Sequence, residues 1–181
     1  MGRKGFGFVL VVAVLGVVLA AGQSTADGSV QGNVYRNRYF KISLALPPNL
    51  HAVELSSLNV HAPSGKNEVF LFAAREGALP YGIVALAERL NVGSNPIVDG
   101  HDFLRRVRET REVGEVIDGQ FSIVKINGPT FERLDYETPK VEFDSAIVTR
   151  VGDYLLVFRC NAKSKEELNV MVDAVTAMRH E

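Results

Sequence analysis

The segment 154–161 constrains the fold more than any other part of the chain, because it is apolar on both faces. Side chains alternate between the two faces of a β-strand, and a strand with one face in water shows alternating polar residues. Here one face would carry Tyr154, Leu156, Phe158 and Cys160, and the other Leu155, Val157 and Arg159. We therefore expect a strand inside a sheet that is covered on both sides, by helices on opposite sides.

Three stretches in the first half of the chain are also typical of β-strands. In residues 40–46 apolar and polar side chains alternate with a period of two, and Pro47 ends the stretch because proline cannot donate to a ladder. Residues 69–74 and 83–90 are almost continuously apolar, as expected of strands covered on both faces. The stretch 83–90 would also tolerate a helix.

Two hairpins are predicted in the second half. Residues 121–126 and 130–137 flank Asn127-Gly128, a dipeptide suited to the positive φ of a tight turn. Residues 141–150 and 154–161 flank the short connection 151–153. Strands joined by such short turns are antiparallel neighbours, so we expect a mostly antiparallel sheet.

Two helices complete the pattern. Asp99 can cap a helix over residues 100–112. Ser164 and Glu167 have the spacing of a capping box at the start of a final helix. The buried stripe of that helix would consist of Leu168, Met171, Val172, Val175 and Met178. The succession predicts an α+β fold, an α/β/α sandwich whose central, mostly antiparallel sheet is flanked by helices.

Several short motifs resemble those of PsbP-like proteins, in the same order along the chain. Residues 35–47, with Tyr35, Asn37 and Pro47, resemble the Tyr-x-Asn step into a first strand closed by proline. A central helix, the segment 126–136, a Tyr-Leu-Leu-Val-Phe strand and the helix opening at Ser164 follow. The resemblance covers residues 34–179.

The resemblance implies the α/β/α sandwich and, for function, binding or assembly instead of catalysis. PsbP-like proteins include the extrinsic subunit of photosystem II, relatives of a Ran-binding factor and many bacterial exported proteins. The chain departs from their pattern at residues 48–50, where Pro-Asn-Leu stands in place of the Pro-x-Gly that a tryptophan often follows. It contains no tryptophan at all. No functional residue is therefore carried over from these proteins.

Residues 1–22 have the layout of a secretory signal peptide. Arg3 and Lys4 precede the uncharged stretch 5–22, and Ala20 and Gly22 fit the cleavage positions. We expect export by the general secretory route, a mature start near Gln23 (or after residue 26), and a periplasmic or extracellular location. An uncleaved membrane anchor is the alternative, because about 18 apolar residues approach the length that spans a bilayer. No lipid anchor is expected, because residue 23 is not a cysteine.

After the signal we expect a flexible leader, residues 23–33, and one domain, residues 34–181. Loss of Arg3 and Lys4 would change the net charge of the chain from −1 to −3. A mildly acidic domain lacks the electrostatic pattern of a nucleic-acid-binding protein. Cys160 is the only cysteine, so no intramolecular disulfide can form; its neighbours predict a small buried hydrophobe.

No motif for a metal, a cofactor or a catalytic centre is evident. The four histidines are far apart and lack the spacing of zinc ligands: His51, His61, His101 and His180. The adjacent His101 and Asp102 point in different directions on a helix, where Asp102 is explained by capping and the helix dipole. We therefore predict no metal and no cofactor.

The densest cationic patch lies on the predicted helix 100–112. It consists of Arg105, Arg106, Arg108 and Arg111, which Asp102, Glu109 and Glu112 nearly offset. Ion pairs between residues one helical turn apart on a solvated face are one interpretation. Docking of an acidic partner or of anionic lipid headgroups is the other.

Two classes of function follow. The first is a non-catalytic exported binding or accessory module of the cell envelope, which acts through contacts with an envelope protein not yet identified. Membrane association would be added if the signal stays uncleaved. The second is a small exported enzyme, such as a hydrolase, whose site converges only in the fold.

Overall fold

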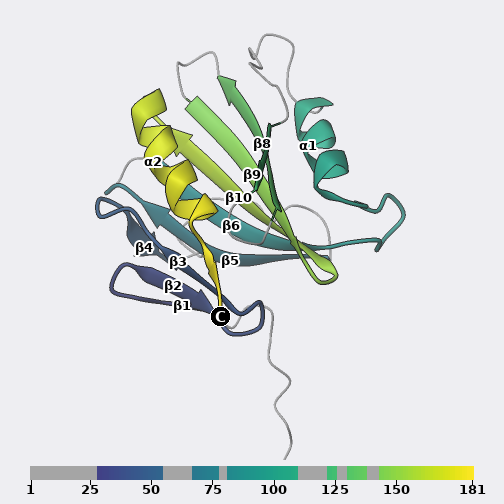
Figure 1. The fold of residues 1–181 in the computed structure, drawn as a ribbon, viewed down its shortest axis with the longest axis horizontal. Helices are drawn as coiled ribbons and strands as arrows, with labels where there is room; N and C mark the ends of the chain where they lie inside the picture. Colours follow the sequence, from purple (N-terminus) through teal and green to yellow (C-terminus); the bar gives the residue numbers. More distant parts are fainter. Residues whose placement is uncertain (1–27, 55–66, 78–80, 110–121, 126–129, 138–142) are drawn as a thin grey trace, which may run out of the picture.

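The computed structural model describes residues 28–54, 67–77, 81–109, 122–125, 130–137 and 143–181. Within these residues, seven antiparallel strands form the larger of two sheets, in the order β4-β5-β6-β10-β9-β8-β7 (Figure 1). The strands are β4 (His51–Val53), β5 (Glu68–Arg75), β6 (Gly82–Arg89), β7 (Ser122–Lys125), β8 (Thr130–Glu137), β9 (Phe143–Val151) and β10 (Tyr154–Ala162). Strand β10 pairs with β6 on one side and with β9 on the other, so it lies inside the sheet as predicted.

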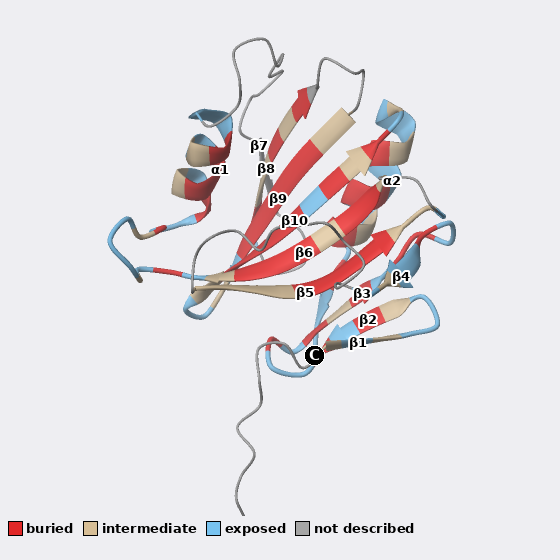
Figure 2. Ribbon diagram, turned by 180° about the vertical axis from the view of Figure 1, so that it is seen from behind, coloured by how far each residue is buried: buried red, intermediate tan, exposed pale blue. Residues whose placement is uncertain are grey.

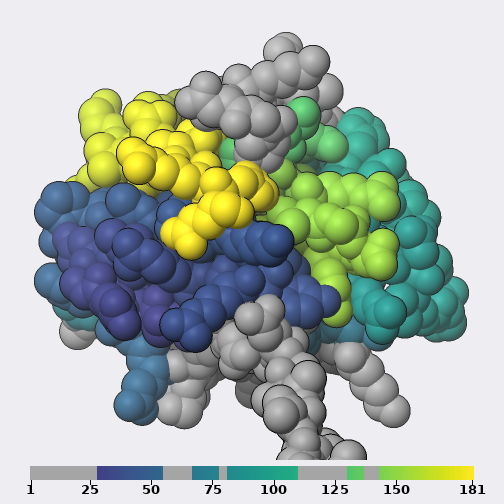
Figure 3. All heavy atoms as spheres, turned by 60° about the horizontal axis from the view of Figure 1, so that its bottom comes forward, coloured from purple at the N-terminus to yellow at the C-terminus, as the bar shows by residue number. Residues whose placement is uncertain are grey.

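A second sheet of four strands was not predicted. It has the order β1-β2-β3-β11. The N-terminal strands (purple to blue) and the C-terminal residues (yellow) lie side by side on one face of the molecule in Figure 3. Its strands are β1 (Gly28–Gln31), β2 (Val34–Asn37), β3 (Ile42–Ala45) and β11 (Arg179–His180). The predicted strand 40–46 thus belongs to this sheet and not to the central one. The alternating pattern of residues 40–46 explains this placement. Only one face of β3, with Ile42 and Leu44, is buried against the core, and Ala45 on the other face is exposed.

Strand β1 corrects the prediction of a flexible leader over residues 23–33. It pairs with β2 through a two-residue turn in which Gly32 has a φ of 58°. Glycine is favoured at the first position of such a hairpin turn because it reaches positive φ without a clash. Residues 28–33 are therefore part of the second sheet. The predicted signal peptide, residues 1–22, lies outside the described residues.

The two helices, α1 (Gly100–Glu109) and α2 (Lys165–Thr176), pack against opposite faces of the large sheet. One buried cluster joins α1 to the face of β10 that carries Leu155 and Val157. The other joins α2 and β3 to the face that carries Leu156 and Phe158. Figure 2 shows the resulting core along the middle strands. Both faces of β10 are covered as predicted, but α2 shares its side with the second sheet.

Both predicted helix caps are present. The Asp99 carboxylate accepts a hydrogen bond from the backbone N–H of Asp102 at 2.8 Å. The Ser164 hydroxyl oxygen accepts one from the backbone N–H of Glu167 at 3.2 Å. Helix α1 ends at Glu109, and residues 110–112 lie outside the described ranges. None of the helices described is long and apolar enough to cross a membrane.

Both predicted hairpins are confirmed by strand pairing. Strands β7 and β8 are antiparallel, with Lys125 opposite Thr130. The Asn127-Gly128 turn between them lies outside the described residues. Strands β9 and β10 pair with Val151 opposite Tyr154, across a turn that contains Gly152. Every strand pair in both sheets is antiparallel within the described part of the chain.

Candidate functional site

The arginines of α1 make contacts within the molecule. Arg105 lies between Asp102 and Glu109, with nitrogen-to-oxygen distances of 2.7 Å to each carboxylate. Arg106 pairs with Asp102 at 2.9 Å and donates a hydrogen bond to the backbone carbonyl of Pro96 at 2.7 Å. The contacts with Asp102 and Glu109 are the helical ion pairs of the first interpretation. The hydrogen bond to Pro96 also ties the segment before the helix to α1.

Of the other two arginines of that patch, only one lies within the described residues. Arg108 is exposed on α1, and Arg111 lies outside the described residues. Partner docking by Arg105, Arg106, Arg108 and Arg111 therefore stays a prediction. Burial opposes ionisation of Asp102, but hydrogen bonds from Arg106 and Arg105 outweigh it and hold the pKa of Asp102 below its usual value. The Asp102 carboxylate is thus charged and bonded to side chains of α1, which agrees with the structural role that the capping interpretation assigns to it.

The histidines are distributed over separate elements. His51 is on β4, His101 is in the first turn of α1 and His180 is on β11, and all three are exposed. His61 lies outside the described residues. In the part of the chain that is described, no three histidine, cysteine, aspartate or glutamate side chains are arranged to hold a metal ion.

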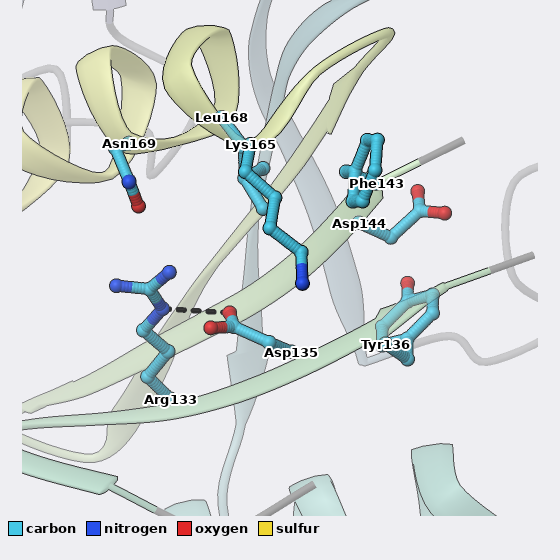
Figure 4. A pocket seen from close by; sticks show the side chains of 8 residues that line it. All are labelled: Arg133, Asp135, Tyr136, Phe143, Asp144, Lys165, Leu168 and Asn169. Carbon is cyan, nitrogen blue, oxygen red and sulfur yellow. Dashed lines mark hydrogen bonds and ion pairs between the residues drawn. The ribbon is translucent and has the colours of Figure 1, made fainter. Parts of the chain in front are cut away.

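Charged side chains converge at a pocket between α2 and the strands β8 and β9 (Figure 4). Its volume is about 150 Å³. It is lined by Arg133, Asp135, Tyr136, Phe143, Asp144, Lys165, Leu168 and Asn169. We call it the β8–α2 pocket. It combines two cations, two carboxylates and two aromatic rings from two consecutive strands and the later helix α2.

The cations of the β8–α2 pocket are held by their neighbours. Arg133 and Asp135 lie two residues apart on β8, and the Arg133 Nε donates to the Asp135 carboxylate at 2.6 Å. The remaining guanidinium nitrogens of Arg133 point toward Asn169 in Figure 4. Lys165, in the first turn of α2, places its ammonium 5.6 Å from the centre of the Phe143 ring. That distance is typical of a cation–π contact.

Next to Asp135 of this pocket, the adjoining strands carry a buried hydroxyl and a buried thiol. Cys160 and Ser145 are opposite one another on β10 and β9, and both are buried. Burial raises the pKa of the Cys160 thiol to about 12, so it remains protonated and is a poor nucleophile. The prediction of a buried hydrophobe is confirmed. The Ser145 hydroxyl has no hydrogen-bond partner in the described part of the chain.

A second convergence of ionisable groups lies on β5 and β6. Glu68 and Glu88 occupy opposite positions in the strand pair, and both side chains are partly buried. Burial, followed by the negative charge of Glu68, raises the pKa of Glu88 to about 7. The neighbouring charges are Arg106 and Asp102 from α1 and Arg159 from β10. We call Glu68 and Glu88 the carboxyl pair.

No protein-family model matches the sequence, and no curated protein matches it either. The structure is similar to the solution structure of cyanobacterial PsbP (CyanoP) from Synechocystis sp. PCC 6803, with a TM-score of 0.56. The alignment covers 88% of this chain and 96% of that one, at 10% sequence identity. The chain has a PsbP-like fold. The resemblance inferred from short motifs is thus confirmed for the fold.

Sequence reasoning found neither convergence within this PsbP-like fold. The signal for Arg133 and Asp135 was present, because residues two apart on a strand share a face. Nothing along the chain indicated that α2 would bring Lys165 and Asn169 to the same place. The carboxyl pair depends on the register between β5 and β6, which the sequence does not display.

Proposed function

We propose that the protein is a non-catalytic exported binding or accessory module of the cell envelope, with the PsbP-like α/β/α sandwich as its frame and protein–protein contacts as its mode of action. The observation that carries the proposal is the β8–α2 pocket. Its charged groups are engaged by neighbouring side chains: Arg133 pairs with Asp135 at 2.6 Å, and Lys165 lies over the Phe143 ring. The neighbouring thiol of Cys160 is protonated and buried. Such a site suits recognition better than covalent catalysis.

The chemistry of the pocket favours a partner segment that carries a carboxylate next to an apolar side chain. The Nε of Arg133 is used by Asp135, but its two terminal nitrogens line the pocket and form a fork that matches a carboxylate. Leu168 and Phe143 supply the apolar wall. The Arg133 side chain lines the pocket and is 18% exposed, so it is not closed off from an incoming partner.

A photo-crosslinking residue tests this proposal in cells that make the full chain. It would replace Asn169, which lines the pocket, or Asp173, which is exposed on α2 outside it. We expect one adduct of defined mass from position 169 and none from position 173. Arg133→Glu should remove the adduct, whereas the matched reversal Arg150→Glu on β9 should keep it. Equal adducts from both positions, or none from position 169, would contradict the proposal.

Export is tested separately by cell fractionation and N-terminal sequencing of the recovered protein. We expect a mature start at Gln23, or after residue 26, in the periplasmic or extracellular fraction. An unprocessed chain in the cytosol would overturn the exported part of the proposal and leave the binding part to the crosslinking result.

A small exported hydrolase is the second candidate, and the carboxyl pair is the observation that favours it. Two carboxyl groups that share a proton can act as general acid and general base. Neither Glu68 nor Glu88, however, lines any of the pockets described here. Turnover of a chromogenic ester or glycoside that disappears in both Glu68→Gln and Glu88→Gln would favour the enzyme over the binding module.

A further inference from the structure

The outer face of the second sheet is strongly basic. Within residues 28–45 and 179–181 there are four cations, Arg36, Arg38, Lys41 and Arg179, and all are exposed. Glu181 is the only carboxylate side chain in these two segments. The whole chain has a net charge of −1, so these two segments are much more positive than the chain as a whole. Arg36 and Arg179 are on strands, and Arg38 and Lys41 are in the turn between β2 and β3. We call the face that carries Arg36 and Arg179, with Arg38 beside it, the basic sheet face.

Strand register places two of these arginines on one row. Arg36 on β2 and Arg179 on β11 both lie opposite Ser43, the central residue of the row on β3. Residues paired directly across strands share a face, and neighbouring strands are about 4.8 Å apart. The backbones of Arg36 and Arg179 are therefore about 10 Å apart, and both side chains project from the same side of the sheet. The buried residues Tyr35 and Ile42 point to the opposite side.

The same face is hollowed. An open depression of about 550 Å³ is lined by Arg36, Arg38 and Glu181, together with β1 residues that include Gly28 and Ser29. Glu181 lies 3.8 Å from Arg36, a long contact between exposed groups that is worth little in water. The guanidinium groups thus remain available to an incoming anion.

The position of this face along the chain indicates what it meets. Strand β1 begins at Gly28, and the apolar segment 5–22 ends six residues earlier. Six residues span at most about 20 Å when fully extended. If the apolar segment is still inserted in a bilayer once the domain has folded, before cleavage or as a retained anchor, the sheet that contains β1 is held beside the bilayer surface.

We propose that the basic sheet face docks onto a bilayer surface that contains anionic phospholipid headgroups. The guanidinium groups of Arg36, Arg38 and Arg179 form forks that match phosphate oxygens. Lysine and arginine side chains near such a surface each strengthen membrane binding by a factor of about five. The hollow beside Arg36 and Arg38 accommodates a headgroup between them.

Vesicle flotation tests this docking with the full chain as recovered from cells. Vesicles of pure phosphatidylcholine report binding by the apolar segment if it is still present. Vesicles with 30% phosphatidylglycerol (roughly the charge density at which such attraction is strong) report the added electrostatic binding. We expect stronger binding to the anionic vesicles, and we expect that difference to disappear in high salt.

Two variants change the basic sheet face in opposite directions. Arg36→Gln with Arg179→Gln should lower binding to anionic vesicles by about tenfold or more, because two charges are removed. Glu181→Gln should raise it by up to about fivefold, a gain that impaired folding would not produce. Arg89→Gln with Arg150→Gln removes the same charge from exposed residues of the large sheet, outside the second sheet and outside the arginines of α1, and should leave binding unchanged.

Four results would overturn the proposal. One is equal binding to neutral and anionic vesicles. Another is an equal loss in the two double variants, which would mean that only net charge matters. The third is competition by inorganic phosphate beyond that of chloride at equal ionic strength, which would indicate a discrete phosphate site. Binding to an acidic protein but not to anionic vesicles would likewise replace the membrane by a protein partner.

Discussion

Glu68 and Glu88 face each other across β5 and β6. Both side chains are partly buried, and the negative charge of Glu68 adds to the effect of burial on Glu88. Burial raises the pKa of both groups, and that of Glu88 reaches about 7. The pair therefore holds a proton at pH values at which an isolated glutamate has lost it.

The carboxyl pair predicts that the protein becomes less stable as pH rises from about 5 to about 8. The pKa of Glu88 is higher in the folded state than in the unfolded chain, so the folded state binds the proton more tightly. The stabilisation is complete near the unfolded pKa and is lost as pH rises through about 7. We expect a loss of about 1–2 kcal/mol, because partial exposure to solvent screens the repulsion. Urea unfolding at a series of pH values measures it.

The variant Glu88→Gln carries a neutral amide in place of the protonated carboxyl and should flatten this pH dependence. At pH 8 it should be more stable than the unmodified protein, and at pH 5 about equal. Glu166→Gln, at an exposed glutamate of α2, should leave the slope in place. A slope that persists unchanged in Glu88→Gln would show that other groups cause it.

Cys160 should not react with thiol reagents in the folded protein. Its exposed fraction is 1%, and burial raises its pKa to about 12, so neither access nor the thiolate is available at pH 8. Ellman's reagent should label less than a tenth of the protein in about an hour under native conditions and label it stoichiometrically in urea. Rapid full labelling without urea would mean that β10 is accessible from solvent.

The cap of α2 should contribute measurably to stability. Removing the Ser164 hydroxyl leaves the Glu167 backbone N–H without its acceptor, so Ser164→Ala should lower the free energy of unfolding by about 1 kcal/mol. Ser164→Thr retains an oxygen at the same place and should cost less than half as much. Equal losses in both variants would mean that the cap is not the cause.

Gly82 should tolerate no side chain. A Cβ at this position would clash with the Ala74 carbonyl oxygen, a backbone atom that only a shift of β5 could move. We expect Gly82→Ala to lower stability by about 3 kcal/mol or more. Gly77→Ala is the matched control, because among the described residues no atom other than those of its chain neighbours lies within 4 Å of its Cβ. It should cost about 1 kcal/mol from its positive φ alone. Thermal unfolding followed by circular dichroism distinguishes the two.

Local patterns in the sequence were sufficient for the individual elements. The caps at Asp99 and Ser164, the helices that follow them and the strand 154–161 all depend on residues within a few positions of one another. Backbone hydrogen bonding and side-chain periodicity act over that range. The period-two pattern in residues 40–46 predicted a strand correctly, but it did not show which sheet the strand would join.

The sequence by itself determined the α+β class, the antiparallel hairpins and the coverage of β10 on both faces, because each follows from short-range periodicity. Only the tertiary structure decided the rest. Register alone set Glu68 against Glu88, and packing of α2 alone brought Lys165 to the strand that carries Arg133. Pairing of β11 with β3 likewise placed Arg36, near the start of the described chain, and Arg179, near its end, on one basic face. Such contacts depend on which distant surfaces bury the most apolar area together, and no local pattern contains that information.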